Sequence, residues 1–136
     1  MDTDMQDLIQ EFVNTDVWAV VGYSSDTSKY GNIIFRDLSK AGYKVYPVNK
    51  KGGQMDGRQV YETVHNLPGD AEVIDFVIPS SQGEKVARQC AKAGFKNVWL
   101  QPGAESDDLI ELCRELDLRV VYNHCAMVEK SRRKKN

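Results

Sequence analysis

Val17-Trp18-Ala19-Val20-Val21-Gly22 is the stretch that decides the fold, because a short apolar run that ends at a glycine is typical of a buried strand leading into a turn. A second run, rich in β-forming residues, follows at Tyr43-Lys44-Val45-Tyr46-Pro47-Val48-Asn49. Between the two runs, residues 32–41 carry apolar side chains at helical spacing, and Gly42 provides a helix stop. The segment therefore predicts a strand, a helix and a second strand in succession.

The same alternation continues along the rest of the chain. Apolar runs predict three further strands, at residues 73–78, 97–101 and 118–122. One helix is expected to end at Gly94, another to begin at the capping residues 106–108, and an extra helix to cover residues 5–13. Strands that are almost continuously apolar indicate burial on both faces. We therefore expect the α/β class, with a single doubly wound, mainly parallel, five-stranded Rossmann-like sheet and an extra N-terminal helix.

Length and composition predict one domain. The chain has 136 residues, of which 41% are hydrophobic and 28% charged, and its formal net charge is -2. We expect a Rossmann-like domain over residues 1–128, with a turn-rich excursion at 52–57, and a solvated, frayed basic tail over 129–136. No apolar run is long enough to span a membrane, and the acidic start is unlike a secretory signal. We therefore expect a cytoplasmic protein, and the net charge makes nucleic-acid binding unexpected.

Two segments are candidates for phosphate binding. The small-residue loop at 22–31 leads into a helix N-terminus, whose free amides and dipole suit a phosphate, although a plain serine-rich connector has the same composition. Lys50 and Lys51 follow the second strand, where NAD-binding domains usually carry a carboxylate. The two ammonium groups suit an extra phosphate, as in NADP or at the 3′ position of coenzyme A (CoA), or else they are solvated turn lysines.

Two more strand ends complete the candidate site. Pro79 ends the third strand, and Ser80 follows it as a possible helix cap. Gln101, Pro102 and Gly103 follow the fourth strand, and the glycine lets a ligand approach the backbone closely. Both segments are equally compatible with ordinary strand-to-helix turns.

Taken together, these segments resemble the small CoA-binding proteins, which are related to the nucleotide-binding domain of the succinyl-CoA synthetase α subunit and of NDP-forming acyl-CoA synthetases. The likeness covers nearly the whole chain and rests on residues 20–24, 29–32, 42–49 and 98–104. It implies that residues 24–32 hold phosphate, that 48–51 surround the adenosine, and that Pro79-Ser80 and Gln101-Pro102 line the remaining cleft. The cofactor-binding residues that this predicts are Gly22, Tyr23, Ser24, Ser25, Lys29, Tyr30, Gly31, Asn32, Val48, Asn49, Lys50, Lys51, Pro79, Ser80, Gln101, Pro102 and Gly103.

The resemblance has one departure and one limit. Related small domains often have a proline where this chain has Lys50, so the adenosine contact is expected to be less rigid or more electrostatic. The larger synthetases depend on a phosphorylated histidine in a following domain, and this sequence ends without one. Synthetase activity is therefore not part of what the likeness implies.

No catalytic constellation is evident in the sequence. The adjacent His124 and Cys125 are expected to point to opposite faces of the fifth strand's end. The three cysteines have neither disulfide nor zinc spacing, and Cys125 alone raises a redox question. We expect a stand-alone module that binds CoA or an acyl-CoA, without a metal and without catalytic residues of its own, rather than an enzyme. The alternatives are an NADP-dependent oxidoreductase, or a nucleotide-sensing regulator that acts as a homodimer or with an unknown protein partner.

Overall fold

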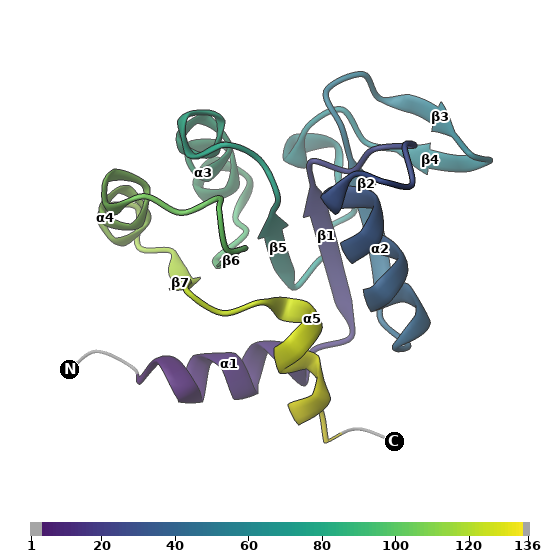
Figure 1. Cartoon of the computed structure of the whole chain (residues 1–136). Helices are drawn as coiled ribbons and strands as arrows, with labels where there is room; N and C mark the ends of the chain where they lie inside the picture. The colour runs from purple at the N-terminus through teal and green to yellow at the C-terminus, as the bar shows by residue number, and fades with distance from the viewer. Residues whose placement is uncertain (1–3, 135–136) are drawn as a thin grey trace.

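A parallel sheet of five strands forms the centre of the structure, a computed structural model that describes residues 4–134 (Figure 1). Its strands lie in the order β2-β1-β5-β6-β7, and every pair of neighbours is parallel. The bounds are β1 (Val17–Val21), β2 (Lys44–Val48), β5 (Val73–Phe76), β6 (Asn97–Leu100) and β7 (Arg119–Val121). The predicted fold class is therefore confirmed, and each predicted strand is present but shorter by one or two residues.

Helices cover both faces of the sheet, as Figure 1 shows. One face packs against α1 (Met5–Val13), α2 (Tyr30–Lys40) and the short α5 (Ala126–Glu129). The other packs against α3 (Ser80–Ala93), α4 (Asp107–Glu115) and the 3₁₀ turn η1 (Val64–Asn66). Side chains alternate between these two layers along β5, where Ile74 and Phe76 contact the α3 and α4 layer while Val73 contacts the α1 layer. This two-sided burial explains the apolar strands.

Two helix ends follow the capping predicted from the sequence, at the start of α4 and at the end of α3. The Ser106 hydroxyl accepts a hydrogen bond from the Leu109 amide at the start of α4, and Gly94 ends α3 in the left-handed conformation. At the start of α3 the prediction of a serine cap is wrong. Pro79 itself is the N-cap and Ser80 is the first helical residue, without a side-chain cap.

The segment after β2, which the sequence predicted to consist of turns, forms a β-hairpin. It consists of β3 (Gly53–Met55) and β4 (Arg58–Val60), which pair antiparallel. Asp56 and Gly57 both have positive φ angles, 50° and 76°, as a tight hairpin turn requires. The chain returns along β2 through a parallel bridge between Val48 and Tyr61. Because of this bridge, residues 62–64 lie beside the end of β2.

The basic tail packs on the domain, so the expectation of a frayed terminus is wrong over residues 130–134. Lys130 forms an ion pair with Asp37 of α2 at 3.1 Å. The guanidinium of Arg133 lies 4.0 Å from the centre of the Tyr43 ring and 2.8 Å from Asp16. An aromatic ring and carboxylates beside α1 and α2 thus hold the tail. Residues 135–136 of the predicted tail lie outside the described residues.

No helix within residues 4–134 is both long and apolar enough to cross a membrane.

Candidate functional site

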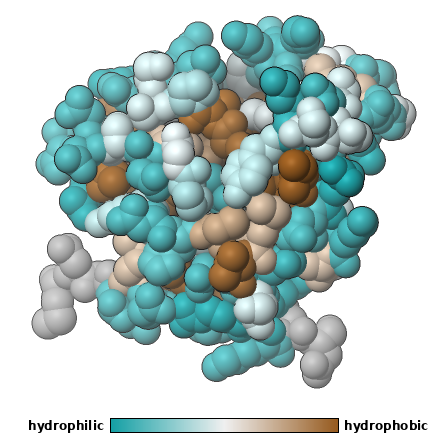
Figure 2. Space-filling view, viewed as in Figure 1, coloured by the Kyte–Doolittle hydropathy of each residue, from teal (hydrophilic) through white to brown (hydrophobic). Residues whose placement is uncertain are grey.

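The strand order reverses direction between β1 and β5, and the loops that follow these two strands diverge there. In open parallel sheets, ligands bind outside the carboxyl ends of the strands at such a switch point. A cleft of about 500 Å³ lies at this position, and Figure 2 shows apolar surface between α3 and the loop leading into α2. Its lining residues are Val21, Gly22, Val48, Asn49, Lys50, Glu62, Thr63, Val64, Ile78, Ser81, Gln82, Lys85, Val86 and Gln89.

Close backbone contacts fix the two ends of the loop between β1 and α2. Gly22 has φ +103°, and a Cβ there would lie 2.2 Å from the Val77 carbonyl oxygen. A Cβ on Gly31 would lie 1.9 Å from the Gly22 carbonyl oxygen. Only glycine allows backbones to approach this closely. The first residue of the loop, Gly22, therefore lies against the backbone that follows β5. The last residue, Gly31, lies against Gly22 itself at the start of α2.

Three predicted site residues contact this loop from within the protein and hold its backbone in place. The Asn32 side chain is buried and donates to the Ser24 carbonyl at 2.7 Å, while the Asn49 side chain donates to the Tyr23 carbonyl at 2.6 Å. The Tyr23 ring is fully buried against Phe35, with ring centres 4.9 Å apart. These side chains stabilise the loop, because their polar groups or rings are already used within the protein.

The exposed side of the loop is suited to an anion. Tyr30 and Gly31 are the first two residues of α2, so their N–H groups have no acceptor within the helix. The Asp26 carboxylate accepts hydrogen bonds from the hydroxyl and the amide of Ser28, which lower its pKa, and it is thereby tied into the turn. The end of the loop therefore offers the amides of Tyr30 and Gly31, with Ser25 and Lys29 exposed nearby.

Cationic and polar side chains from two other elements face the cleft. Lys50 lines it at the end of β2, and Lys51 follows with its amide bonded to the Asn49 side chain at 2.8 Å. Three polar residues of α3 also line the cleft, Ser81, Lys85 and Gln89. The sequence analysis did not predict them as site residues. Their spacing of four residues along one predicted helix face was the signal that could have identified them.

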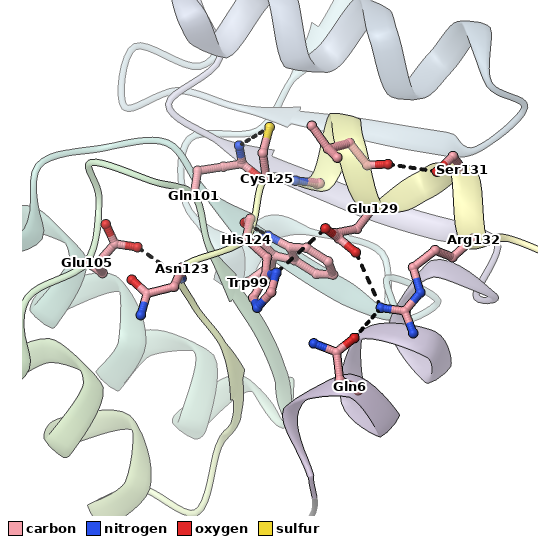
Figure 3. A network of polar contacts seen from close by, with 12 residues as sticks. Gln6, Trp99, Gln101, Glu105, Asn123, His124, Cys125, Glu129, Ser131 and Arg132 are labelled. Carbon is pink, nitrogen blue, oxygen red and sulfur yellow. Dashed lines mark hydrogen bonds and ion pairs between the residues drawn. The ribbon is translucent and has the colours of Figure 1, made fainter.

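Of the predicted site residues, only Gly22, Val48, Asn49 and Lys50 line this cleft, and those after β5 and β6 do not. Pro79 and Ser80 precede the lining residue Ser81 but are not part of the lining. Gln101 is fully buried, and its side chain accepts from the Ala126 amide at 2.9 Å and donates to Cys125 Sγ at 3.4 Å (Figure 3). Pro102 and Gly103 are exposed, and Gly103 has φ +96°, so its own backbone already favours glycine. Their contact with a ligand stays a prediction.

His124 and Cys125 lie in the loop after β7, which ends earlier than expected. His124 Nδ1 is 3.6 Å from Glu129, and the His124 carbonyl accepts the Trp99 indole N–H, whereas Cys125 contacts Gln101 (Figure 3). The two side chains thus have separate partners. Within residues 4–134, no group of three or more His, Cys, Asp or Glu side chains is placed to hold a metal ion.

Comparison with known proteins finds relatives that share this arrangement of sequence and fold. A family model described as CoA binding domain matches residues 16–131. The alpha subunit of ADP-forming acetate–CoA ligase II from Pyrococcus furiosus is 26% identical over 129 residues, covering 87% of this chain. The matched part is 28% of that subunit, so the chain spans less than a third of the length of this relative.

Solved structures of similar size share both the fold and the sequence pattern. A conserved hypothetical protein from Pyrococcus furiosus is 40% identical with a TM-score of 0.80, and the match covers 85% of this chain and 98% of that one. A hypothetical protein from Pyrococcus horikoshii OT3 is 31% identical with a TM-score of 0.84, covering 96% and 92% of the two chains. The whole α/β domain is therefore shared.

Proposed function

The chain belongs to the CoA binding domain family, and on this premise we propose that it binds CoA or an acyl-CoA at the carboxyl edge of its sheet. The resemblance inferred from the sequence motifs is confirmed at the level of the family. The observation that carries the proposal is the cleft at the switch point, which Gly22 and Lys50 line, together with the N-terminus of α2, where Gly31 lies against the Gly22 carbonyl.

The groups of CoA have matching partners in this cleft and beside it. The diphosphate suits the N-terminus of α2, where Tyr30 and Gly31 offer unbonded amides. Lys50 and Lys51 suit the 3′-phosphate, because an ammonium group binds phosphate as a compact point charge. The apolar lining, which includes Ile78, suits the less polar parts of the ligand. The residues present therefore fit the cofactor, and the protein's part is to bind and orient it.

The residues at the end of β2 favour CoA over NAD. NAD-binding domains usually place a carboxylate here to accept the ribose hydroxyls. This chain has Asn49, whose amide is already engaged with the Tyr23 carbonyl, and then two lysines. A ligand with a phosphate on its adenosine ribose is consequently preferred. A cytoplasmic location and a homodimer or protein partner stay predictions alongside this proposal.

The proposal is tested by calorimetry with CoA and dephospho-CoA, which lacks the 3′-phosphate. We expect Lys50→Ala and Lys51→Ala each to weaken CoA binding about fivefold to tenfold, because a charge-assisted contact at an exposed site contributes roughly 1 kcal/mol or somewhat more. Dephospho-CoA should bind all forms alike. Lys40→Ala, an exposed lysine in the last turn of α2, is the matched control and should leave both affinities unchanged.

Two outcomes would contradict the proposal. Absence of CoA binding by the unmodified protein removes it entirely. Dephospho-CoA binding as tightly as CoA, with both lysine variants at the wild-type affinity, removes the assignment of the 3′-phosphate to the end of β2.

A further inference from the structure

A carboxylate that the sequence analysis did not place in the site lines the proposed CoA cleft. Glu62 is the second residue after β4, and its side chain is exposed in the cleft. The residue before it, Tyr61, forms a parallel bridge with Val48 of β2. The Tyr61 amide donates to the Pro47 carbonyl at 2.9 Å, and the Tyr61 carbonyl accepts from the Asn49 amide at 2.9 Å. These backbone bonds fix the position of Glu62 beside the end of β2.

The two lysines at the end of β2 lie on a turn that contacts Glu62. The Gly52 amide donates to the Asn49 carbonyl at 2.8 Å, and this bond closes a turn with Lys50 and Lys51 at its central positions. Gly52 has φ +60°, and a Cβ added to it would lie 3.3 Å from the Glu62 Cβ. Groups of opposite charge therefore meet at one part of the cleft, from two neighbouring backbone segments.

The charged groups of this part of the cleft are not paired with each other. Within residues 4–134, no ion pair or side-chain hydrogen bond involves the Glu62 carboxylate or the ammonium groups of Lys50 and Lys51. The next residue along the chain, Thr63, differs in this respect, because its hydroxyl accepts from the His65 amide at 3.2 Å and caps η1. The carboxylate and the lysines are therefore free to contact a ligand.

A carboxylate beside two ammonium groups is suited to a ribose that carries one hydroxyl and one phosphate. A carboxylate accepts a hydrogen bond from a hydroxyl group, and NAD-binding domains use an acidic residue in this way at the end of the second strand. The same carboxylate repels a phosphate, whereas an ammonium group attracts one. The adenosine ribose of CoA has a free 2′-hydroxyl and a 3′-phosphate, and NADP has the opposite arrangement.

We propose that Glu62 determines the specificity of the cleft by accepting the 2′-hydroxyl of the ribose while Lys50 and Lys51 hold the 3′-phosphate. This inference rests on the proposed function and extends it to the position of the phosphate on the ribose. A ligand bound in the same orientation with its phosphate at the 2′ position would direct that phosphate at the Glu62 carboxylate. The cleft therefore selects adenosine 3′-phosphates and excludes adenosine 2′-phosphates, because specificity includes repulsion of the wrong ligand.

Calorimetry with CoA and with its isomer that carries the phosphate at the 2′ position tests the proposal. The two ligands have the same composition and the same charge, so a general attraction to lysines contributes equally to both. We expect the wild-type chain to bind CoA about tenfold more tightly than the 2′-isomer, because like charges brought together are strongly unfavourable. Equal affinities for the two isomers, or tighter binding of the 2′-isomer, overturn the proposal.

Glu62→Gln separates the charge of this side chain from its capacity to accept a hydrogen bond. The glutamine keeps a carbonyl oxygen for the 2′-hydroxyl, so CoA affinity should stay within about threefold of wild type. The 2′-isomer should bind about fivefold more tightly than to wild type, because the repulsion is lost. Glu62→Lys should go further and bind the 2′-isomer at least as tightly as CoA.

Glu115→Gln is the matched control for these variants. Glu115 is an exposed carboxylate at the end of α4 and is not among the residues that line the cleft. It removes the same charge from the protein and should leave both affinities unchanged. If Glu62→Gln strengthens the binding of both isomers equally, the carboxylate only lowers the positive potential of the cleft, and its role in selecting the isomer is refuted. An unchanged ratio of the two affinities in Glu62→Gln refutes it as well.

The same titrations distinguish failure of this inference from failure of the proposed function. If the wild type binds CoA but does not discriminate between the isomers, the role of Glu62 is refuted and the binding function stands. If the wild type binds neither isomer, the proposed function itself fails, and the inference fails with it.

Discussion

Gly31→Ala is the substitution for which the structure gives the sharpest expected effect on the loop between β1 and α2. The added Cβ would lie 1.9 Å from the Gly22 carbonyl oxygen and 2.8 Å from its carbon, so the two backbones must separate by roughly 1 Å. Such overpacking costs about 3 kcal/mol, at the upper end of the usual range, because the atoms in contact are backbone. Alanine in a helix gains about 1 kcal/mol over glycine, which offsets part of this cost.

The net expectation for Gly31→Ala is a loss of about 2 kcal/mol in the free energy of unfolding. With a urea dependence of about 2 kcal/mol per molar, the unfolding midpoint should fall by about 1 M. The same displacement moves the first-turn amides of α2, so CoA affinity should fall as well, measured on the folded variant by calorimetry.

Gly69→Ala is the matched control for this experiment. Gly69 lies in a loop where an added Cβ meets nothing within 4 Å, and its φ angle is not positive. Its midpoint should stay within the equivalent of about 0.5 kcal/mol of wild type. If Gly31→Ala unfolds at the same urea concentration as Gly69→Ala, the close approach of the loop's two ends is refuted.

Two further substitutions test the packing and the buried carboxyl. Arg133→Ala should lower the free energy of unfolding by about 1–2 kcal/mol in the same urea series, because the guanidinium stacks on the Tyr43 ring; an unchanged midpoint would mean that the tail does not pack. Burial raises the pKa of Asp75, so the protonated side chain stabilises the folded state at low pH, and this contribution is lost as pH rises above the unfolded pKa of about 3.9. The stability advantage of Asp75→Asn over wild type should therefore grow from pH 4 to pH 8, and a difference independent of pH would contradict the burial of an ionisable group.

The sheet could be predicted from the sequence because its strands are buried on both faces. Residues 17–21 and 44–48 are recognisable without knowledge of the rest of the chain, since apolar runs that end at turn residues report burial directly. The hairpin at 53–60 lacks that signal because most of its side chains are exposed. The Asp56-Gly57 pair was its one available indication.

The packed tail could not have been predicted from local patterns. Arg133 contacts Asp16 and Tyr43, residues that are distant in sequence and come together only when the sheet has formed. The sequence of a basic run does not indicate whether its side chains are solvated or stacked on an aromatic ring. Composition therefore indicated solvation, and tertiary structure decided otherwise.

The candidate site was predictable in position but not in the direction of its side chains. Strand ends at residues 22 and 48 identify the edge of the sheet at which the cleft lies. Whether Asn32 and Asn49 face a ligand or the loop backbone depends on contacts that only the folded loop supplies, and both face the backbone. Lys85 was missed because a lysine on a helix usually indicates a solvated surface.

Parallel calorimetric titrations with CoA and NADP, under reducing conditions, test the central claim most directly. Both ligands carry a phosphate on the adenosine ribose, so a difference in affinity reports more than charge at Lys50 and Lys51. The proposed function predicts that CoA binds at least tenfold more tightly than NADP. Equal or tighter binding of NADP, or no binding of CoA, would contradict it.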